Sequence, residues 1–295
     1  MPADPMPAAE VAIDEPLVRT LLADQHPDLA GLPLTDPVFG WDNVMFRLGN
    51  GLMVRLPRRA QSAVLVEHEQ RWLPRLAASL PLPVPAPVRV GRAALGYPWS
   101  WSVCPWLPGE PASTCPSVDP VDAAVALGGF LAALHREAPA DAPTNRLRGV
   151  PLSMRSELFF TAVGRLDSPE ARSRATSLWH QIVATPPWTG PQVWLHGDLH
   201  PSNVLVRDGR IAAVIDFGDI TSGDPATDLA VAWMMLPTGV RDTLRAAAGP
   251  VDDDTWRRAR GWALALAVAI LSRSGDNRVM HQVATRTLDA VLEEG

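Results

Sequence analysis

The sequence predicts an α+β fold of two lobes, a small N-terminal lobe built on an antiparallel sheet and a mostly helical C-terminal lobe. Three observations support this. Strand patterns with one long helix among them fill residues 38–107, a break rich in proline and glycine follows at 108–111, and helical periodicity dominates from residue 121 onward. We therefore divide the chain into a loose tail (1–14), an N-terminal lobe (15–107) and a C-terminal lobe (108–295).

The N-terminal lobe begins with a short amphipathic helix, predicted over residues 15–25 by the spacing of its leucines. Strand patterns then cover 38–48 and 52–56, and the Gly49-Asn50-Gly51 between them tolerates the positive φ of a hairpin turn. A second helix is expected over 62–78. The regularly spaced prolines of the next segment exclude helix there. The remaining elements are an extended segment at 80–87 and strands at 87–90 and 97–107.

The C-terminal lobe is predicted to be helical except for one compact β-rich patch at residues 192–217. Its helices are expected where apolar residues recur every three or four positions. They cover 121–135, 153–163, 169–184, 225–235, 239–248, 255–272 and 278–293.

Composition narrows the class of protein. The 295 residues carry a net charge of −6 without a basic tract, which argues against broad nucleic-acid binding. The longest apolar run, 262–271, is too short to cross a membrane, and residues 1–16 lack the pattern of a signal peptide. Cys104 and Cys115 are too few for a disulfide framework and fit a reducing compartment, so we expect a cytoplasmic protein. The oligomeric state stays open.

The most informative pattern is H-x-D-x-x-x-x-N from residue 196, followed by D-F-G from residue 216. Asp198 follows one predicted strand, Asn203 precedes the next, and Asp216 ends the partner strand, so a hairpin should bring all three to one rim. Two carboxylates and an amide suit a hard cation such as Mg²⁺ and leave one carboxylate to accept a proton from a hydroxyl. This division of labour is typical of kinases.

These residues resemble the aminoglycoside phosphotransferase family of protein-kinase-like small-molecule kinases, over roughly 36–236. The resemblance rests on residues 196–203, 215–219 and 223–230, with upstream support at 55–59, Glu69, 82–87, 108–109 and 134–135. It implies a protein-kinase-like fold, with Asp198 as catalytic base and Asn203 and Asp216 as Mg²⁺ ligands. Asp228 would be a buried acceptor for the catalytic loop's backbone. His196 would buttress that loop, and His200 would contact either the loop or the substrate.

The resemblance also implies ATP or GTP as phosphoryl donor, although two of the usual features are missing. The segment Gly40-Trp41-Asp42-Asn43 stands in place of a G-x-G-x-x-G loop. Its backbone N–H groups, those of Gly40 and Asn43 among them, are candidates for holding phosphates. All 26 basic residues are arginine, so Arg55 occupies the position of the strand lysine. Its expected partner is Glu69, with Glu67 as rival; Arg58 or Arg59 could substitute for Arg55. Trp106 and Leu107 are expected where adenine meets the hinge.

We therefore expect a phosphotransferase that moves a γ-phosphoryl group to a hydroxyl of a small molecule, aminoglycoside-like or another antibiotic. The first alternative is a metabolic kinase of choline, amino-alcohol, homoserine or sugar type; the second is a nucleotide-binding scaffold without activity. Acids that could attract a cationic acceptor are Glu157, Asp219, Asp224, Asp252, Asp253, Asp254, Glu293 and Glu294.

Overall fold

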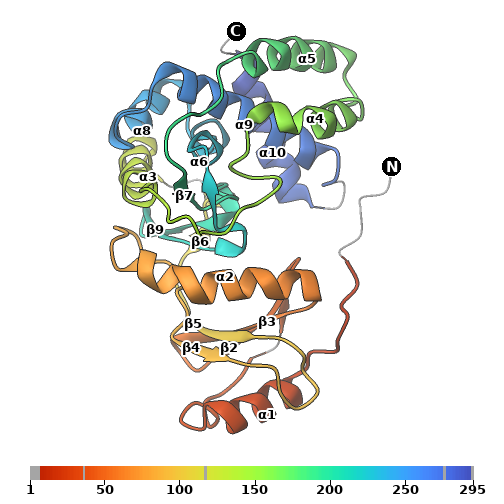
Figure 1. The fold of residues 1–295 in the computed structure, drawn as a ribbon, viewed down its shortest axis with the longest axis vertical. Helices are drawn as coiled ribbons and strands as arrows, with labels where there is room; N and C mark the ends of the chain where they lie inside the picture. Colours follow the sequence, from red (N-terminus) through yellow and green to blue (C-terminus); the bar gives the residue numbers. More distant parts are fainter. Residues whose placement is uncertain (1–6, 36, 116–117, 275–276, 294–295) are drawn as a thin grey trace. The chain divides into compact units, whose positions relative to one another are not determined.

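The computed structural model describes residues 7–35, 37–115, 118–274 and 277–293 (Figure 1). The chain divides into two compact units. The sheet unit runs to Pro108 and includes Asp216–Gly218, and the helical unit comprises Gly109–Ile215 and the chain from Asp219 onward. None of the described helices is both long and apolar enough to cross a membrane. Glu294, one of the candidate acids, lies outside the described residues.

The sheet unit is built on five antiparallel strands in the order β1-β2-β3-β5-β4. The strands are β1 (Val38–Phe39), β2 (Asn43–Leu48), β3 (Leu52–Pro57), β4 (Arg89–Gly91) and β5 (Trp101–Pro105). The predicted hairpin joins β2 to β3, with Gly49 at φ 59° in the turn. Residues 38–48, expected as one strand, form two, because the Gly40 amide donates to the Asn43 carbonyl (2.8 Å) and closes a turn between them.

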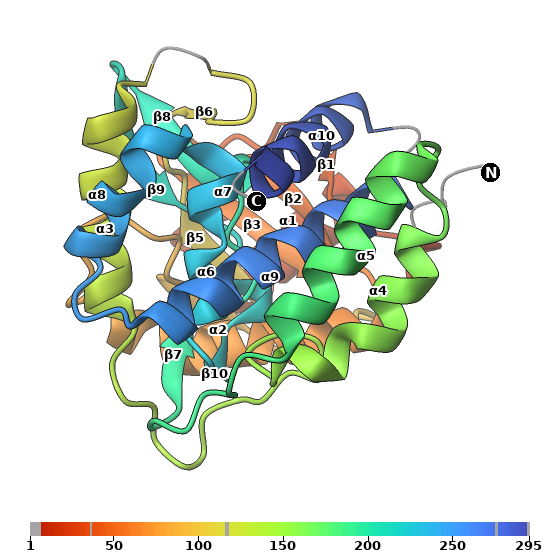
Figure 2. The same ribbon diagram turned by 90° about the horizontal axis from the view of Figure 1, so that it is seen from above.

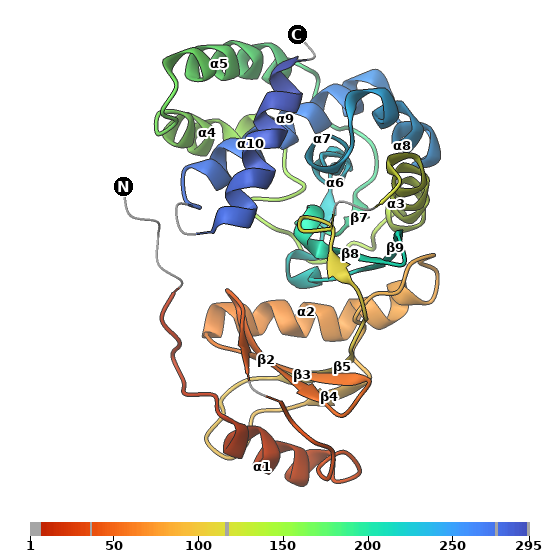
Figure 3. The ribbon, with the colours of Figure 1, turned by 180° about the vertical axis from the view of Figure 1, so that it is seen from behind.

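Helices cover both faces of this sheet (Figure 3): α1 (Glu15–Gln25) on one and α2 (Ala60–Ala77) on the other. Alternation along a strand sends Phe46 and Val54 into the core that α1 closes. Arg55, the next residue after Val54, therefore faces α2. The two-residue period of β3 thus carries a charged group to the helix that holds Glu69.

The helical unit is centred on α9 (Asp253–Leu271), as Figure 2 shows. Trp262 on this helix is fully buried. Asp252 begins α9 as its cap, accepting from the Thr255 amide at 2.6 Å. Around α9 lie other helices of the unit. They are α4 (Ser156–Val163), α5 (Pro169–Val183), α6 (Ala226–Leu229), α7 (Val231–Met235) and α10 (Arg278–Glu293); α3 (Pro120–Leu134) pairs with α8 (Arg241–Ala247).

Two small antiparallel sheets complete the helical unit. One joins β6 (Glu110–Pro111), β8 (Val204–Arg207) and β9 (Arg210–Val214), and the other joins β7 (Val193–Leu195) to β10 (Thr221–Gly223). The loop between β7 and β8 carries Asp198. The break predicted at residues 108–111 is thus partly a strand, because the backbone of Glu110 and Pro111 pairs with β8.

One predicted helix, 225–235, is divided into α6 and α7. The backbone at Ala230 stays helical, with φ −54° and ψ −25°, but these are the angles of a tighter 3₁₀ turn, which interrupts the α-helical hydrogen bonding. The division leaves Asp228 on the first segment, facing the loop that follows β7.

Candidate active site

The loop after β7 is held by a buried carboxylate. The side chain of Asp228 is inaccessible to solvent and accepts from the backbone amides of His196 (2.7 Å) and Gly197 (2.9 Å). His135 Nε2 lies 3.3 Å from the same carboxylate. Gly197 has φ 86°, and a Cβ there would collide with the carbonyl oxygen of Asp219. The predicted role of Asp228 as a backbone acceptor is confirmed.

His196 links this loop to β9. Its Nδ1 accepts from the Asp198 amide at 3.2 Å, so the ring proton of the neutral form lies on Nε2. That nitrogen donates to the Ile215 carbonyl at 3.0 Å. His196 is fully buried and both ring nitrogens are committed to backbone groups. The ring therefore supports the loop, as predicted.

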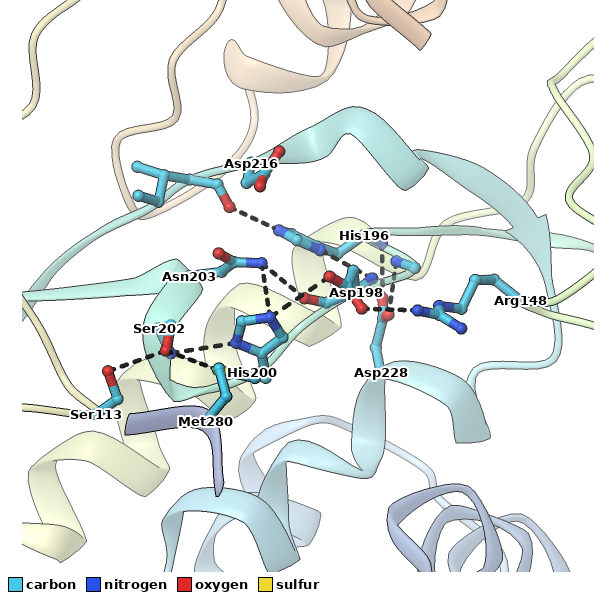
Figure 4. A network of polar contacts seen from close by, with 12 residues as sticks. Ser113, Arg148, His196, Asp198, His200, Ser202, Asn203, Asp216, Asp228 and Met280 are labelled. Atoms are coloured by element: carbon cyan, nitrogen blue, oxygen red, sulfur yellow. Dashed lines mark hydrogen bonds and ion pairs between the residues drawn. The ribbon is translucent and has the colours of Figure 1, made fainter. Parts of the chain in front are cut away.

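Asp198 carries the carboxylate at the centre of the motif, and its side chain is 30% exposed. Arg148 Nη2 lies 2.8 Å from Oδ1, and His200 Nε2 lies 3.4 Å from Oδ2 (Figure 4). Burial raises the pKa of Asp198, but Arg148 first and His200 second outweigh it and hold that pKa far below its ordinary value. Asp198 is therefore ionised at neutral pH, and part of its carboxylate is accessible to solvent.

The sequence did not predict Arg148. It lies in the segment between α3 and α4, fifty positions from Asp198 along the chain, and belongs to no motif. Only the structure pairs the two residues. Burial lowers the pKa of Arg148, but Asp198 and then Asp219 outweigh this and raise it.

Asn203 closes the loop from the other end. Its Nδ2 donates to the Asp198 carbonyl at 2.9 Å, which leaves the amide oxygen Oδ1 as the atom available to a ligand. The Ile215 amide donates to the Asn203 carbonyl at 2.9 Å, and Asp216 is the next residue in the chain. His200 Nδ1 accepts from the Ser202 amide at 3.2 Å, which turns Nε2 toward Asp198. His200 thus belongs to the loop's own hydrogen bonding.

In the sheet unit, Arg55 is the central cation. Its Nη1 pairs with Glu69 on α2, as the helix periodicity predicts, and its Nη2 lies 3.2 Å from Asp216 Oδ1. The donors around Asn43 assign its amide oxygen to the side of Arg55, where it accepts from Nε and Nη2 at 3.0 Å each. Burial lowers the pKa of Arg55, but Glu69 and Asp216 outweigh it and raise that pKa. Glu67, the alternative partner, instead accepts a hydrogen bond from the Ser100 hydroxyl at 3.3 Å.

Asp216 and Glu69 each have one carboxylate oxygen to which no other described residue donates a hydrogen bond. Asp216 stands at φ 64°, which is unusual outside glycine, and its side chain is 57% exposed. Glu69 Oε1 is buried and has no hydrogen-bond partner in the part of the chain that the structure describes. Burial raises the pKa of Glu69, and Arg55 opposes this without cancelling it. The strained backbone holds the Asp216 carboxylate toward Arg55.

The other predicted nucleotide residues lie in the same unit. Arg58 donates to the Gly40 carbonyl at 3.1 Å, which ties the loop to the start of α2. The Trp106 amide donates to Gly51 at 2.8 Å and is therefore not available to a base. Leu107 follows, half-buried, and its amide makes no hydrogen bond with the described residues.

The candidate acids of the helical unit have structural partners. Asp224 pairs with Arg258 in the interior, at 2.7 Å. Asp219 accepts from Asn145 at 2.8 Å. Asp253 and Asp254 form ion pairs with Arg245 and Arg257, Asp252 caps α9, and Glu157 and Glu293 lie exposed on their helices. Within residues 7–293, as far as these are described, no three His, Cys, Asp or Glu side chains gather as a metal site.

The antiparallel sheet with its Arg–Glu pair and the H-x-D-x-x-x-x-N loop define a protein-kinase-like enzyme of mixed α+β class, as predicted. A family model described as "phosphotransferase enzyme family" matches residues 35–262. The chain belongs to this family.

Two curated relatives match part of the chain. The homoserine kinase of Methylocella silvestris is 34% identical over 127 residues, which are 41% of this chain and 39% of the relative. The viomycin phosphotransferase of Streptomyces vinaceus is 33% identical over 127 residues, 42% of each chain. The matched segments thus span about two fifths of these relatives' length.

Solved structures share the fold over nearly the whole chain. The GDP complex of wild-type aminoglycoside 2′-phosphotransferase-IIIa superposes with a TM-score of 0.73 at 20% identity, covering 96% of this chain and all of that one. The macrolide 2′-phosphotransferase MphH from Brachybacterium faecium gives a TM-score of 0.63 at 23% identity, covering 92% and 96%. At these identities the likeness establishes the fold.

Proposed function

We propose that this protein transfers the γ-phosphoryl group of ATP or GTP to a hydroxyl group of a small molecule. The observation that carries the proposal is the partly exposed carboxylate of Asp198, on a loop fixed by Asp228, His196 and Asn203. In this proposal residues 15–107 bind the nucleotide, residues 108–295 carry catalysis and acceptor binding, and residues 1–14 form a tail. The reaction would take place in the cytoplasm.

Asp198 would receive the acceptor hydroxyl. The hydroxyl oxygen forms a bond to the γ-phosphorus, the bond from that phosphorus to the β-phosphate oxygen breaks, and the hydroxyl proton passes to Asp198. Because the pKa of Asp198 is held low, the carboxylate is a weak base in the ground state. We infer that it orients the hydroxyl first and accepts the proton late, which suits a loose phosphoryl-transfer transition state.

Nucleotide binding is assigned to the sheet unit. Arg55, held by Glu69 and Asn43, offers its fixed charge to phosphate oxygens. The turn at Gly40 offers backbone N–H groups, and the unbonded amide of Leu107 beside Trp106 suits the donor base. Two of the solved neighbours are described as complexes with GDP or ADP, which supports a nucleotide donor.

The residues expected to hold Mg²⁺ fit a hard cation. Asn203 has its amide oxygen left over and Asp216 has an unpartnered, exposed carboxylate oxygen, and such oxygens are the ligands that Mg²⁺ prefers. We propose that these two residues bind it, with the nucleotide's phosphates and water completing the shell. When bound, Mg²⁺ would neutralise charge between the β- and γ-phosphates.

For the acceptor we propose an aminoglycoside-like compound or another antibiotic, a class that the viomycin phosphotransferase relative supports. The homoserine kinase relative supports the alternative, a metabolic kinase of homoserine, choline, amino-alcohol or sugar type. A scaffold without activity is the weaker alternative, since Asp198, Asn203 and Asp216 are all present.

The test is the Asp198→Ala variant in a coupled ADP-release assay over a panel of hydroxylated compounds. We expect phosphoryl transfer to fall by at least roughly 10²–10⁴-fold while Mg-nucleotide binding changes little, because the carboxylate acts on the hydroxyl and not on the donor. Arg286→Gln, at an exposed site on α10, is the matched control. Turnover at the wild-type rate in Asp198→Ala would refute the assignment.

A further inference from the structure

The segment before α1 contacts the sheet unit through Glu10. Its backbone amide donates to the Arg58 carbonyl at 2.9 Å, and its carboxylate oxygen Oε2 accepts from the Ala60 amide at 3.0 Å. Apolar packing fixes the same segment beyond Glu10, because Ile13 is buried in the core that α1 closes and Val11 packs against that core. Glu10 is therefore held against the junction between β3 and α2.

The Glu10 carboxylate caps α2 from outside the helix. Arg59, the N-cap residue of α2, makes no capping hydrogen bond with its side chain among the described residues. The first amides of a helix have no acceptor within it, so a side-chain oxygen that accepts from one of them stabilises the start of the helix. Glu10 supplies that oxygen, and its negative charge suits the positive end of the helix dipole.

The residues that Glu10 contacts lie next to those that hold the Gly40 turn. The Arg58 amide donates to the Asp42 carbonyl at 2.9 Å, and Arg58 Nη1 donates to the Gly40 carbonyl at 3.1 Å. Arg59 Nη2 lies 2.8 Å from Asp42 Oδ1. Residues 58 to 60 thus bond to Glu10 on one side and to the turn on the other.

We propose that Glu10 is a positioning residue for the nucleotide, because it fixes the start of α2 and thereby keeps the Gly40 turn where the donor's phosphates bind. This inference rests on the proposed function, in which the turn and Arg55 hold those phosphates. The turn ends at Asn43, whose amide oxygen accepts from Arg55 Nε and Nη2 at 3.0 Å each. A displaced turn would therefore also change the support of Arg55.

Loss of this contact should weaken nucleotide binding and spare the transfer step. An interaction that holds the donor equally in the ground state and the transition state changes KM, and not kcat, when it is removed. In Glu10→Ala we expect the KM for ATP and the Kd of Mg-ADP to rise roughly 3- to 10-fold, the range for one hydrogen bond, while kcat at saturating ATP changes little.

The experiment compares Glu10→Ala with Glu10→Gln, which keeps an acceptor oxygen, and with Asp14→Ala as the matched control. Asp14 lies further along the same segment and caps α1, where its Oδ1 accepts from the Leu17 amide at 3.0 Å. Both alanine variants should lower the melting temperature by roughly 1–3 °C. Only Glu10→Ala should weaken Mg-ADP binding in calorimetric titration and raise the KM for ATP in the coupled assay, and Glu10→Gln should restore most of both.

Hydrogen exchange follows the turn without any nucleotide. The Gly40 and Arg58 amides both donate to carbonyls of the turn, so they exchange slowly while the turn is held. Their exchange should accelerate in Glu10→Ala and stay at the wild-type rate in Asp14→Ala. A merely structural Glu10 would instead lower the melting temperature and leave the exchange of the turn and the KM for ATP unchanged.

The outcomes are distinct. Unchanged nucleotide affinity in Glu10→Ala, unchanged exchange at the turn, or an equal loss of affinity in Asp14→Ala would overturn the inference. Wild-type transfer to any compound of the panel would leave the phosphotransferase proposal standing in each of these cases. A wild-type protein that binds neither Mg-ADP nor Mg-GDP would overturn both the proposed function and this inference.

Discussion

Replacing Asp228 by alanine removes the carboxylate that accepts hydrogen bonds from the backbone amides of His196 and Gly197. Both amides belong to the loop that carries Asp198. The Asp228 side chain is closed to water, so in the alanine variant no solvent replaces the acceptor that these two N–H groups lose.

The expected loss can be worked from these two bonds. A hydrogen bond to a charged group contributes about 1.5–3 kcal/mol, so removing both should lower the free energy of unfolding by about 3–6 kcal/mol. Asp228→Asn keeps one acceptor oxygen but turns an NH₂ toward the other amide, so about 1.5–3 kcal/mol is expected. Against a total stability of about 5–15 kcal/mol, Asp228→Asn should stay folded at room temperature, and Asp228→Ala stays folded when the total exceeds its loss of about 3–6 kcal/mol.

Urea denaturation followed by tryptophan fluorescence measures the loss of stability. The coupled ADP assay measures the effect on kcat. A loop displaced by about 1 Å should cost roughly 10²-fold in kcat, with little change in nucleotide binding. Thr287→Val, which removes a buried hydroxyl on α10 bonded to the Val283 carbonyl, is the control expected to lose stability without losing kcat. An alanine variant within about 1 kcal/mol of wild type would show that Asp228 does not hold the loop.

Two other changes test separate parts of the helical unit. Gly197→Ala should lower the free energy of unfolding by about 1–3 kcal/mol and lower kcat, because φ 86° and the Asp219 carbonyl both oppose a Cβ. The control Gly239→Ala, whose Cβ would lie in open space, should change that free energy by no more than about 0.5 kcal/mol. Equal melting temperatures for the two variants would contradict this prediction. Asp252→Ala should cost about 1 kcal/mol at neutral pH through loss of the α9 cap. The backbone hydrogen bond from Thr255 lowers the pKa of Asp252, so the capping benefit is present above the ordinary value of about 4 and lost as pH falls through the folded value; a stability difference that persists unchanged in acid would contradict this.

Local patterns predicted most of the fold. The hairpin through Gly49 follows from residues that accept positive φ, and α9 follows from a capping aspartate and a regular apolar face. The errors share a physical origin. The turn at Gly40 is held by groups from the start of α2, where Arg58 donates to Gly40 and Arg59 pairs with Asp42. Such long-range contacts override a strand pattern that is read from neighbours alone.

The same difference between local patterns and long-range contacts separates the site residues that the sequence could predict from those that it could not. Asp228 and His196 lie in or near one motif, so the sequence could predict that they hold the backbone of the loop. The hydrogen bond of Asn203 to the Asp198 carbonyl was not predicted. Arg148 could not be found, because nothing in its own segment marks it and its partner lies fifty positions away.

This division has a chemical meaning. The groups that fix the position of Asp198 come from the motif itself: the Asp228 carboxylate, the His196 ring and the Asn203 amide bind backbone atoms and leave the reacting carboxylate open. The charge that most lowers the pKa of that carboxylate, Arg148, comes from a connecting segment with no motif. Replacing Arg148 would alter the charge beside Asp198 without touching the hydrogen bonds that hold the backbone of its loop. We therefore expect substitutions in the motif to abolish phosphoryl transfer, and substitution of Arg148 to change the charge that an acceptor meets at Asp198.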